Sequence, residues 1–157
     1  MKTKAVIGIL VTGLVALVVA GCGLQEASGN PDNGVPPLDD GTKSVEIELT
    51  SDELAQQKDI TREIEVKLPG SVIVILGSNP TTGFDWQDAE IGDEAVLTEY
   101  FRQFVEPQSD VVGAPGKDVW TFKTLKTGTT TVKFEYSRPW EGGEKGEYTV
   151  ELTITVK

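Results

Sequence analysis

Strict alternation of apolar and polar side chains is the feature that most limits how this chain can fold. Residues 148–156 alternate Tyr, Val, Leu and Ile with Thr and Glu, and residues 132–136 alternate Val, Phe and Tyr with Lys and Glu. Residues 120–123 alternate Trp and Phe with Thr and Lys. A period of two places one face of a strand in a core and the other in solvent. The C-terminal half is therefore expected to consist of half-buried strands.

Further strands are expected earlier in the chain. Residues 45–49 and 64–68 show the same alternation, and Phe and Trp flank an outward Asp in residues 84–86. Residues 100–105 are a weaker candidate. Residues 72–76 are apolar throughout, which favours a central strand that is covered on both faces.

The remaining local signals are turns and one short helix. Residues 51–58 could form one or two helical turns, with Ser51 or Asp52 as the N-cap. Turns are indicated at residues 127–128 and 141–143 by their glycines. Seven to eight short strands separated by turns predict an all-β fold, namely an immunoglobulin-like β-sandwich.

The N-terminus resembles a bacterial lipoprotein signal. Two lysines precede the uncharged residues 5–20, and small residues lead to Cys22, the only cysteine of the 157-residue chain. We interpret residues 1–21 as a signal peptide and Cys22 as the lipid-modified N-terminus, although an uncleaved anchor helix is an alternative. The resemblance implies a lipid-anchored protein of the cell envelope that faces the extracytoplasmic side. The lone cysteine allows no intramolecular disulfide.

A flexible tether is expected between this anchor and the folded part. Residues 22–43 are rich in Gly, Pro, Asn and Asp and poor in large apolar side chains. The sandwich domain is therefore assigned to residues 44–157, which is enough chain for one small core.

The charge of the chain argues against nucleic acid as a partner. The formal net charge is −11, and Lys2 and Lys4 are the only charges before Cys22, which leaves −13 on residues 22–157. Such an acidic domain repels polyanions.

Catalytic groups are scarce. The chain has no histidine, so it lacks the commonest general base and zinc ligand. No glycine-rich phosphate loop leads into a helix. A carboxylate pair could still form a hydrolase site, but nothing marks one among the 25 acidic residues. We therefore expect a protein that is not an enzyme, with no cofactor and no metal site.

Three stiff loops between expected strands are the best candidates for function. The first loop is Asn79–Phe84, the second is Gly113–Gly116 and the third is Arg138–Trp140. Proline fixes φ in each of them, and β-branched threonines stiffen the first. By strand parity, Arg138 and Trp140 continue the inward side beyond the strand end, whereas Ser137 points outward. Ordinary turns, and a Trp140 folded back over the core edge, remain alternative interpretations.

Together the three loops resemble those of the chagasin family, protein inhibitors of papain-like cysteine peptidases. The family pattern is an Asn-Pro-Thr-Thr-Gly-aromatic loop, then a Gly-x-Gly-Gly loop, then Arg-Pro-Trp, on an immunoglobulin-like sandwich. The resemblance covers the whole folded domain. It implies a peptidase-binding surface that consists of Asn79, Pro80, Thr81, Thr82, Gly83, Phe84, Gly113, Ala114, Pro115, Gly116, Arg138, Pro139 and Trp140.

The resemblance also implies a mechanism. The first loop would enter the peptidase cleft and cover its catalytic Cys and His, and the other two loops would grip the cleft on either side. Inhibition would be reversible and noncovalent, and a monomer is expected because the loop tip must be free. Pro115 departs from the family pattern, since it removes an amide donor where glycine is usual.

Two other classes remain open from the residues alone. A carbohydrate or surface-ligand binding module could stack sugars on Trp140 or Trp86, although parity places Trp86 on the buried side. A structural envelope domain without a small ligand is the third interpretation.

Overall fold

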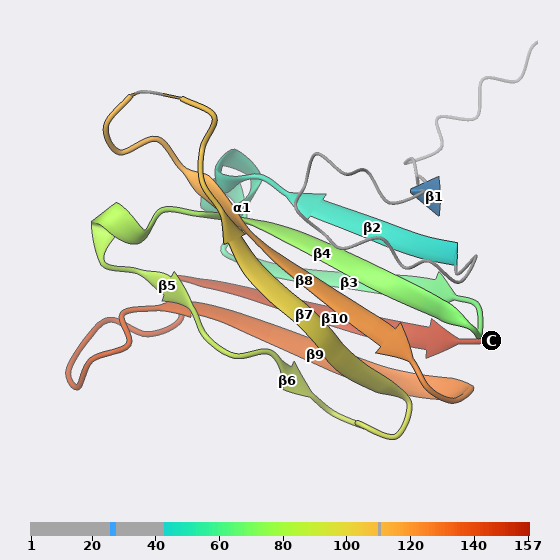
Figure 1. Ribbon diagram of the computed structural model, residues 1–157. Helices are drawn as coiled ribbons and strands as arrows, with labels where there is room; N and C mark the ends of the chain where they lie inside the picture. The colour runs from blue at the N-terminus through green and yellow to red at the C-terminus, as the bar shows by residue number, and fades with distance from the viewer. Residues whose placement is uncertain (1–25, 28–42, 110) are drawn as a thin grey trace, which may run out of the picture.

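Two facing β-sheets make up the part of the chain that the structure describes (Figure 1). The computed structural model describes residues 26–27, 43–109 and 111–157. The first sheet has the order β1 (Glu26–Ala27), β2 (Lys43–Leu49), β4 (Gly70–Ser78), β8 (Gly116–Thr124) and β7 (Leu97–Val105). The second has the order β3 (Asp59–Val66), β10 (Tyr148–Val156), β9 (Gly128–Ser137) and β5 (Asp85–Trp86), and β6 (Glu90–Ile91) also pairs with β9. The predicted β-sandwich is confirmed.

Most neighbouring strands are antiparallel, as short turns require. The exceptions are β2 with β4 and β3 with β10, which are parallel. The loop between β4 and β5, the loop between β7 and β8 and the loop between β9 and β10 all lie at one end of the sandwich, and the C-terminus lies at the other (Figure 1).

Aromatic side chains from both sheets fill the core. Trp120 of the first sheet contacts Phe134 of the second, with ring centroids 4.9 Å apart, and Phe122 contacts the same ring at 6.1 Å. Trp86 meets Trp120 edge-on at 6.4 Å. These edge-to-face contacts are the arrangement that aromatic quadrupoles favour.

Strand β4 is buried along its whole length, as residues 72–76 predict. Val72, Val74 and Leu76 belong to the core between the sheets. Ile73 and Ile75 lie on the opposite face of the strand and form a second cluster with Val119.

The short helix is present, but its N-cap precedes the predicted candidates and the helix ends earlier than the predicted residue 58. Helix α1 covers Ser51–Gln56, and its N-cap is Thr50 rather than Ser51 or Asp52. The hydroxyl oxygen of Thr50 accepts from the amide of Glu53, and the Glu53 carboxylate accepts from the Thr50 amide, which is a capping box. These hydrogen bonds from Thr50 lower the pKa of Glu53.

Other differences concern strand ends and very short strands. The alternation over residues 64–68 predicted a strand through Leu68, but β3 ends at Val66. Two-residue strands are too short to show alternation, and β1 and β6 were not predicted.

The N-terminal predictions fall mostly outside the described residues. The signal segment and Cys22 lie there, as does most of the expected tether. Within the tether segment, Glu26–Ala27 pairs antiparallel with Val45 and Ser44 of β2. Among the described residues, no helix is long and apolar enough to span a membrane.

Candidate functional site

The first loop is closed by its own hydrogen bonds. The Oδ1 of Asn79 accepts from the Thr81 hydroxyl at 2.6 Å and from the Thr81 amide at 3.3 Å. The Asn79 carbonyl accepts from the Thr82 hydroxyl at 2.7 Å and from the Thr82 amide at 3.1 Å. Residues Pro80–Thr82 form a 3₁₀ turn as a result. A loop with its polar groups paired in this way loses little entropy when it binds a partner.

Gly83 is required where the first loop turns back. Its φ is 80°, in the left-handed region that side chains disfavour. A Cβ on Gly83 would also lie 2.9 Å from Cη2 of Trp140. The absence of a side chain therefore lets the third loop pack directly on the first.

Tyr136 of strand β9 contacts both ends of the first loop. The hydroxyl oxygen of Tyr136 accepts from the Asn79 amide at 2.8 Å. The ring of Phe84 stacks on that of Tyr136, with centroids 5.6 Å apart. Nearby, Nε1 of Trp86 donates to the Gly77 carbonyl at 3.0 Å. Both ends of the loop are thus fixed to the core.

A side-chain hydrogen bond links the second loop to the first. The Nδ2 of Asn79 donates to the Gly113 carbonyl at 3.1 Å. At the far end of the second loop, a Cβ on Gly116 would lie 2.5 Å from the Phe104 ring and 2.6 Å from the Val105 carbonyl oxygen. Only glycine fits there, and Gly116 is buried in the ladder opposite Ser78. Pro115 is exposed and lines a pocket with Asn79, Thr82 and Phe84.

The third loop is folded around Arg138. Its amide donates to the Glu144 carbonyl at 2.8 Å, and its guanidinium lies 4.5 Å from the Phe84 ring centroid and 5.9 Å from that of Trp140. Trp140 is 52% exposed, so it projects from the tip as expected rather than folding over the core. An exposed tryptophan beside an arginine is the composition of an interface anchor.

Ser137 points outward as parity predicts, since its side chain meets that of Glu135, two residues earlier on the same face of β9. It is nevertheless fully buried. Its hydroxyl donates to the Glu135 carboxylate and accepts from the Gly146 amide. The third loop bends back over β9 and covers this position, so an outward side chain is shielded from solvent.

The structure brings all three loops together, with different exposure along them. The exposed residues are Pro80, Thr81, Thr82, Gly113, Pro115, Pro139 and Trp140. Those partly buried are Asn79, Gly83, Phe84, Ala114 and Arg138. The first set can contact a partner directly, whereas the second set mainly holds the loops in place.

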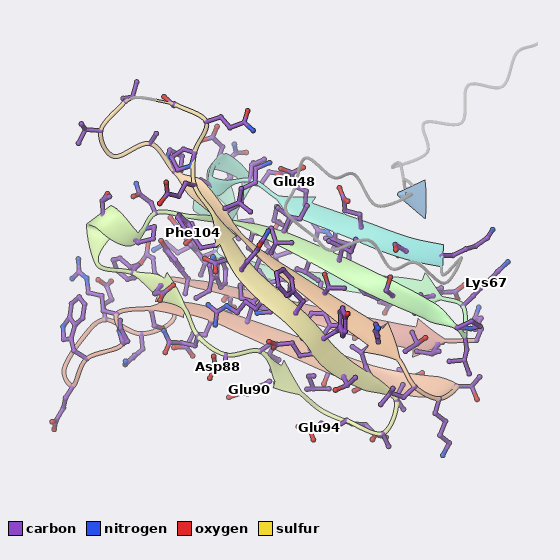
Figure 2. All side chains as sticks on the ribbon, in the orientation of Figure 1. Glu48, Lys67, Asp88, Glu90, Glu94 and Phe104 are labelled. Atoms are coloured by element: carbon purple, nitrogen blue, oxygen red, sulfur yellow. The ribbon has the colours of Figure 1, made fainter. Side chains whose placement is uncertain are left out.

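Sequence reasoning missed two exposed apolar residues at the second loop. Val111 is 70% exposed and Val112 is 99% exposed, immediately before Gly113. Phe104, labelled in Figure 2 near the same end of the sandwich, is 39% exposed. The available signal was the pair of adjacent valines, which lies outside any alternating run. Apolar side chains in a loop that belongs to no strand have no core face to bury them.

A charged cluster lies under the first two loops. Arg102 donates from Nη2 to the Trp86 carbonyl at 2.6 Å, and its Nη2 lies 3.5 Å from Oδ1 of Asp118. Its Nη1 pairs with Asp88 at 3.1 Å, and the guanidinium lies over the Trp120 ring at 4.8 Å. Asp118 is only 4% exposed, and burial raises its pKa.

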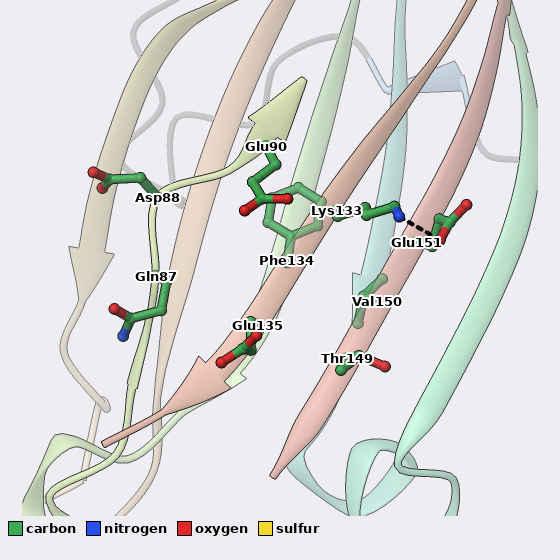
Figure 3. A pocket seen from close by; sticks show the side chains of 9 residues that line it. All are labelled: Gln87, Asp88, Glu90, Lys133, Phe134, Glu135, Thr149, Val150 and Glu151. Carbon is green, nitrogen blue, oxygen red and sulfur yellow. Dashed lines mark ion pairs between the residues drawn. The ribbon is translucent and has the colours of Figure 1, made fainter. Parts of the chain in front are cut away.

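The outer face of the second sheet carries a separate shallow pocket (Figure 3). Lys133 and Glu151 form an ion pair of 3.5 Å there, and acidic side chains such as Asp88 and Glu90 surround it. Its one aromatic residue, Phe134, is buried. The pocket therefore has no exposed ring on which a sugar could stack. Over the described ranges, no cluster of three or more acidic, His or Cys side chains is arranged for a metal.

Comparison with known proteins agrees with this geometry. Residues 65–154 match the family described as Chagasin family peptidase inhibitor I42. The match spans most of the sandwich, and this chain belongs to the chagasin family of peptidase inhibitors. Members of this family are inhibitors rather than enzymes, and this chain is accordingly not an enzyme.

Individual relatives support the assignment. Chagasin from Trypanosoma cruzi is 34% identical over 83 residues, which are 50% of this chain and 67% of that protein. Amoebiasin-2 from Entamoeba histolytica is 28% identical over 101 residues, 64% of this chain and 82% of that protein. The crystal structure of the cysteine protease inhibitor EhICP2 from Entamoeba histolytica superposes with a TM-score of 0.59 at 24% identity. That match covers 73% of this chain and 97% of the other, and it shows the shared fold.

Proposed function

We propose that this inhibitor of papain-like cysteine peptidases acts by inserting its three loops together into the active-site cleft. The observation that carries the proposal is the contact of the first loop with both others. Asn79 bonds to the Gly113 carbonyl, and Trp140 packs on Gly83. The three loops form one preorganised wedge, so little ordering entropy opposes binding.

The first loop is suited to block a cleft without being cleaved. Thr81, Thr82 and Gly83 form its tip, and the chain there is a 3₁₀ turn followed by a left-handed residue. This compact backbone differs from the extended conformation that strand-like recognition of a peptide needs. Binding is therefore noncovalent, and no peptide bond of the loop is cut.

The flanking loops supply contacts of two different kinds. Trp140 on the third loop acts as an anchor against the enzyme surface, with the partly buried Arg138 guanidinium beside it. The second loop offers backbone groups at Gly113 and exposed apolar side chains at Val111 and Val112, which would occupy an apolar part of the cleft. Pro115 offers no amide, so the second loop binds mainly through its other residues.

Titration of the full chain against papain and a cathepsin L-like enzyme tests the proposal. We expect tight inhibition that is reversed on dilution, with an intact inhibitor chain by mass spectrometry. An interface of the standard size, about 800 Å² per partner, is consistent with this strength. Full peptidase activity at micromolar inhibitor would contradict the proposed function. A cleaved first loop would contradict the mechanism alone.

A lipid anchor at Cys22 is the second part of the proposal. It is supported by the uncharged segment at residues 5–20 and the small residues before the cysteine. The inhibitor would stand on the extracytoplasmic side of a membrane, carried by the polar segment 22–43. Metabolic labelling with a fatty acid tests this, because Cys22→Ala should abolish the label and release the chain from the membrane fraction. Label that persists in the variant would disprove the anchor.

The carbohydrate-binding alternative is not favoured. Trp86 is 1% exposed and donates to the Gly77 carbonyl, so it is not available for stacking. Trp140 alone remains, and its indole packs on Gly83 of the first loop.

A further inference from the structure

Tyr136 is a residue outside the three loop motifs, yet it contacts the base of the first and third loops. It lies on β9, is 5% exposed and belongs to the core. Its hydroxyl oxygen accepts from the Asn79 amide at 2.8 Å, and its carbonyl accepts from the Glu147 amide at 2.9 Å. One residue therefore holds the start of the first loop and closes the stem of the third.

The bond to Asn79 occurs where the first sheet ends. The β4–β8 ladder stops at the pair Ser78 and Gly116, so Asn79 has no ladder partner for its amide. The Tyr136 hydroxyl, which reaches across from the second sheet, supplies that acceptor. The direction in which the first loop leaves β4 is thereby set by β9.

The ring of Tyr136 also helps to position the third loop. It stacks between Phe84 at 5.6 Å and Tyr148 at 5.5 Å. The Arg138 guanidinium in turn lies over the Phe84 ring, 4.5 Å from its centroid. A movement of the Tyr136 ring would displace the Phe84 ring, and the Arg138 guanidinium would lose its contact with that ring.

We infer that Tyr136 is a positioning residue for peptidase inhibition, which acts through the Asn79 amide to hold the first loop in its binding conformation. This inference rests on the proposed function. Without the hydroxyl, Asn79 would leave β4 in several directions, and only a fraction of molecules would be ready to bind. The measured affinity is then the intrinsic affinity multiplied by that fraction.

Tyr136→Phe tests the inference because it keeps the stacked ring and removes only the hydroxyl. Thr130→Val is the matched control. Thr130 lies on the same strand, and its hydroxyl accepts from the Asp93 amide at the same distance, 2.8 Å, but at the opposite end of the sandwich. Each variant leaves one loop amide without its side-chain acceptor, and comparable losses of thermal stability are expected.

The full chain, purified in detergent, is measured in all three forms against papain. We expect Tyr136→Phe to raise the inhibition constant about three- to tenfold, mainly through slower association, and Thr130→Val to leave it unchanged. Amide exchange by NMR should show faster exchange at Asn79 in Tyr136→Phe only.

Three results would overturn the inference. An equal inhibition constant for Tyr136→Phe and the wild type would do so, as would an equal rise in both variants, since the effect would then be one of stability. Unchanged exchange at Asn79 would show that the hydroxyl does not hold the loop. A wild-type chain that fails to inhibit any papain-like peptidase would instead remove the proposed function, and the inference with it.

Discussion

The first and second loops lie side by side at one end of the sandwich, but they are held in opposite ways. In the first loop, Asn79 alone makes four hydrogen bonds to Thr81 and Thr82. In the second, the amide of Ala114 donates to the Val111 carbonyl, and Gly113 accepts from the Asn79 side chain. The internal conformation of the first loop is thus fixed by its own hydrogen bonds, whereas the second loop depends on the first for part of its position.

The first and second loops are therefore expected to contribute to affinity in different ways. A self-bonded loop contributes by being preorganised, and any change within it should be costly. A loop made of glycine, alanine and exposed valines contributes by adaptable contact, and changes there should cost less. Substitutions in the first loop should therefore weaken inhibition more than substitutions in the second.

Thr82→Asp should have the largest effect. The proposed wedge buries Thr82 in the cleft, and an unpaired carboxylate there would cost about 3 kcal/mol or more, over a hundredfold in the inhibition constant. The carboxylate also cannot donate to the Asn79 carbonyl as the Thr82 hydroxyl does. Inhibition assays compare this variant with Thr129→Asp, which makes the same charge change on an exposed residue at the other end. Equal inhibition by both variants would place the first loop outside the cleft.

Trp140→Ala should be the next most damaging change. Loss of a buried aromatic anchor costs about 2 kcal/mol or more, roughly thirtyfold in the inhibition constant. Leu125→Ala is a close control, because Leu125 is also 52% exposed but lies at the opposite end of the sandwich. An unchanged inhibition constant for Trp140→Ala would remove this residue from the interface.

Asn79→Asp tests the link between the first two loops. It keeps an oxygen for Thr81 but replaces the Nδ2 donor that bonds to the Gly113 carbonyl at 3.1 Å. We expect a loss of about 1 kcal/mol, around fivefold in the inhibition constant. Gln87→Glu is the control, since the Gln87 Nε2 donates to the Asp85 carbonyl at the same distance outside the loops. If both variants inhibit equally well, the second loop does not rely on the first.

Asp118 lies beneath the first and second loops. Its replacement should change the stability of the fold rather than the inhibition constant. Burial raises its pKa above the ordinary 3.8, Asp85 adds to the rise, and Arg102 opposes it. The native chain therefore holds this proton more tightly than the unfolded chain does. That stabilisation is complete below the ordinary pKa and is lost as pH rises through the native pKa.

The measurement for Asp118 is a difference in melting temperature. Asp118→Asn has no titrating group at this position, so subtraction of its melting temperature cancels the other acids. The wild-type value minus the variant value should fall as pH rises from about 3 to 7. A difference that does not vary with pH would mean that Asp118 titrates normally.

The regular part of the fold could be predicted because strand alternation is local information. The runs in residues 120–123, 132–136 and 148–156 lie in β8, β9 and β10. Each run is long enough for its period to be read. The N-cap was placed one or two residues late because Thr50, Ser51 and Asp52 are all good caps, and only the capping box with Glu53 distinguishes them.

The site could be predicted as three segments but not as one surface. The bond from Asn79 to Gly113 joins residues 34 positions apart. Packing of Trp140 on Gly83 likewise depends on how two loops approach in space. The same is true of Tyr136, whose alternating pattern indicates only a core residue. Contacts of this kind follow from tertiary geometry, which local propensity does not encode.

Pro115→Gly should have the smallest effect and gives the finest test of the comparison. It restores the backbone amide of the usual family pattern, but it also frees φ in the unfolded chain and in the loop. The second effect should lower the free energy of unfolding by about 0.5 kcal/mol. Because Pro115 is exposed and Gly116 remains fixed opposite Ser78, we expect the inhibition constant to rise only about twofold through lost preorganisation. Tighter inhibition of papain would mean that a donated hydrogen bond outweighs stiffness, and the second loop would then bind through its backbone rather than through its shape.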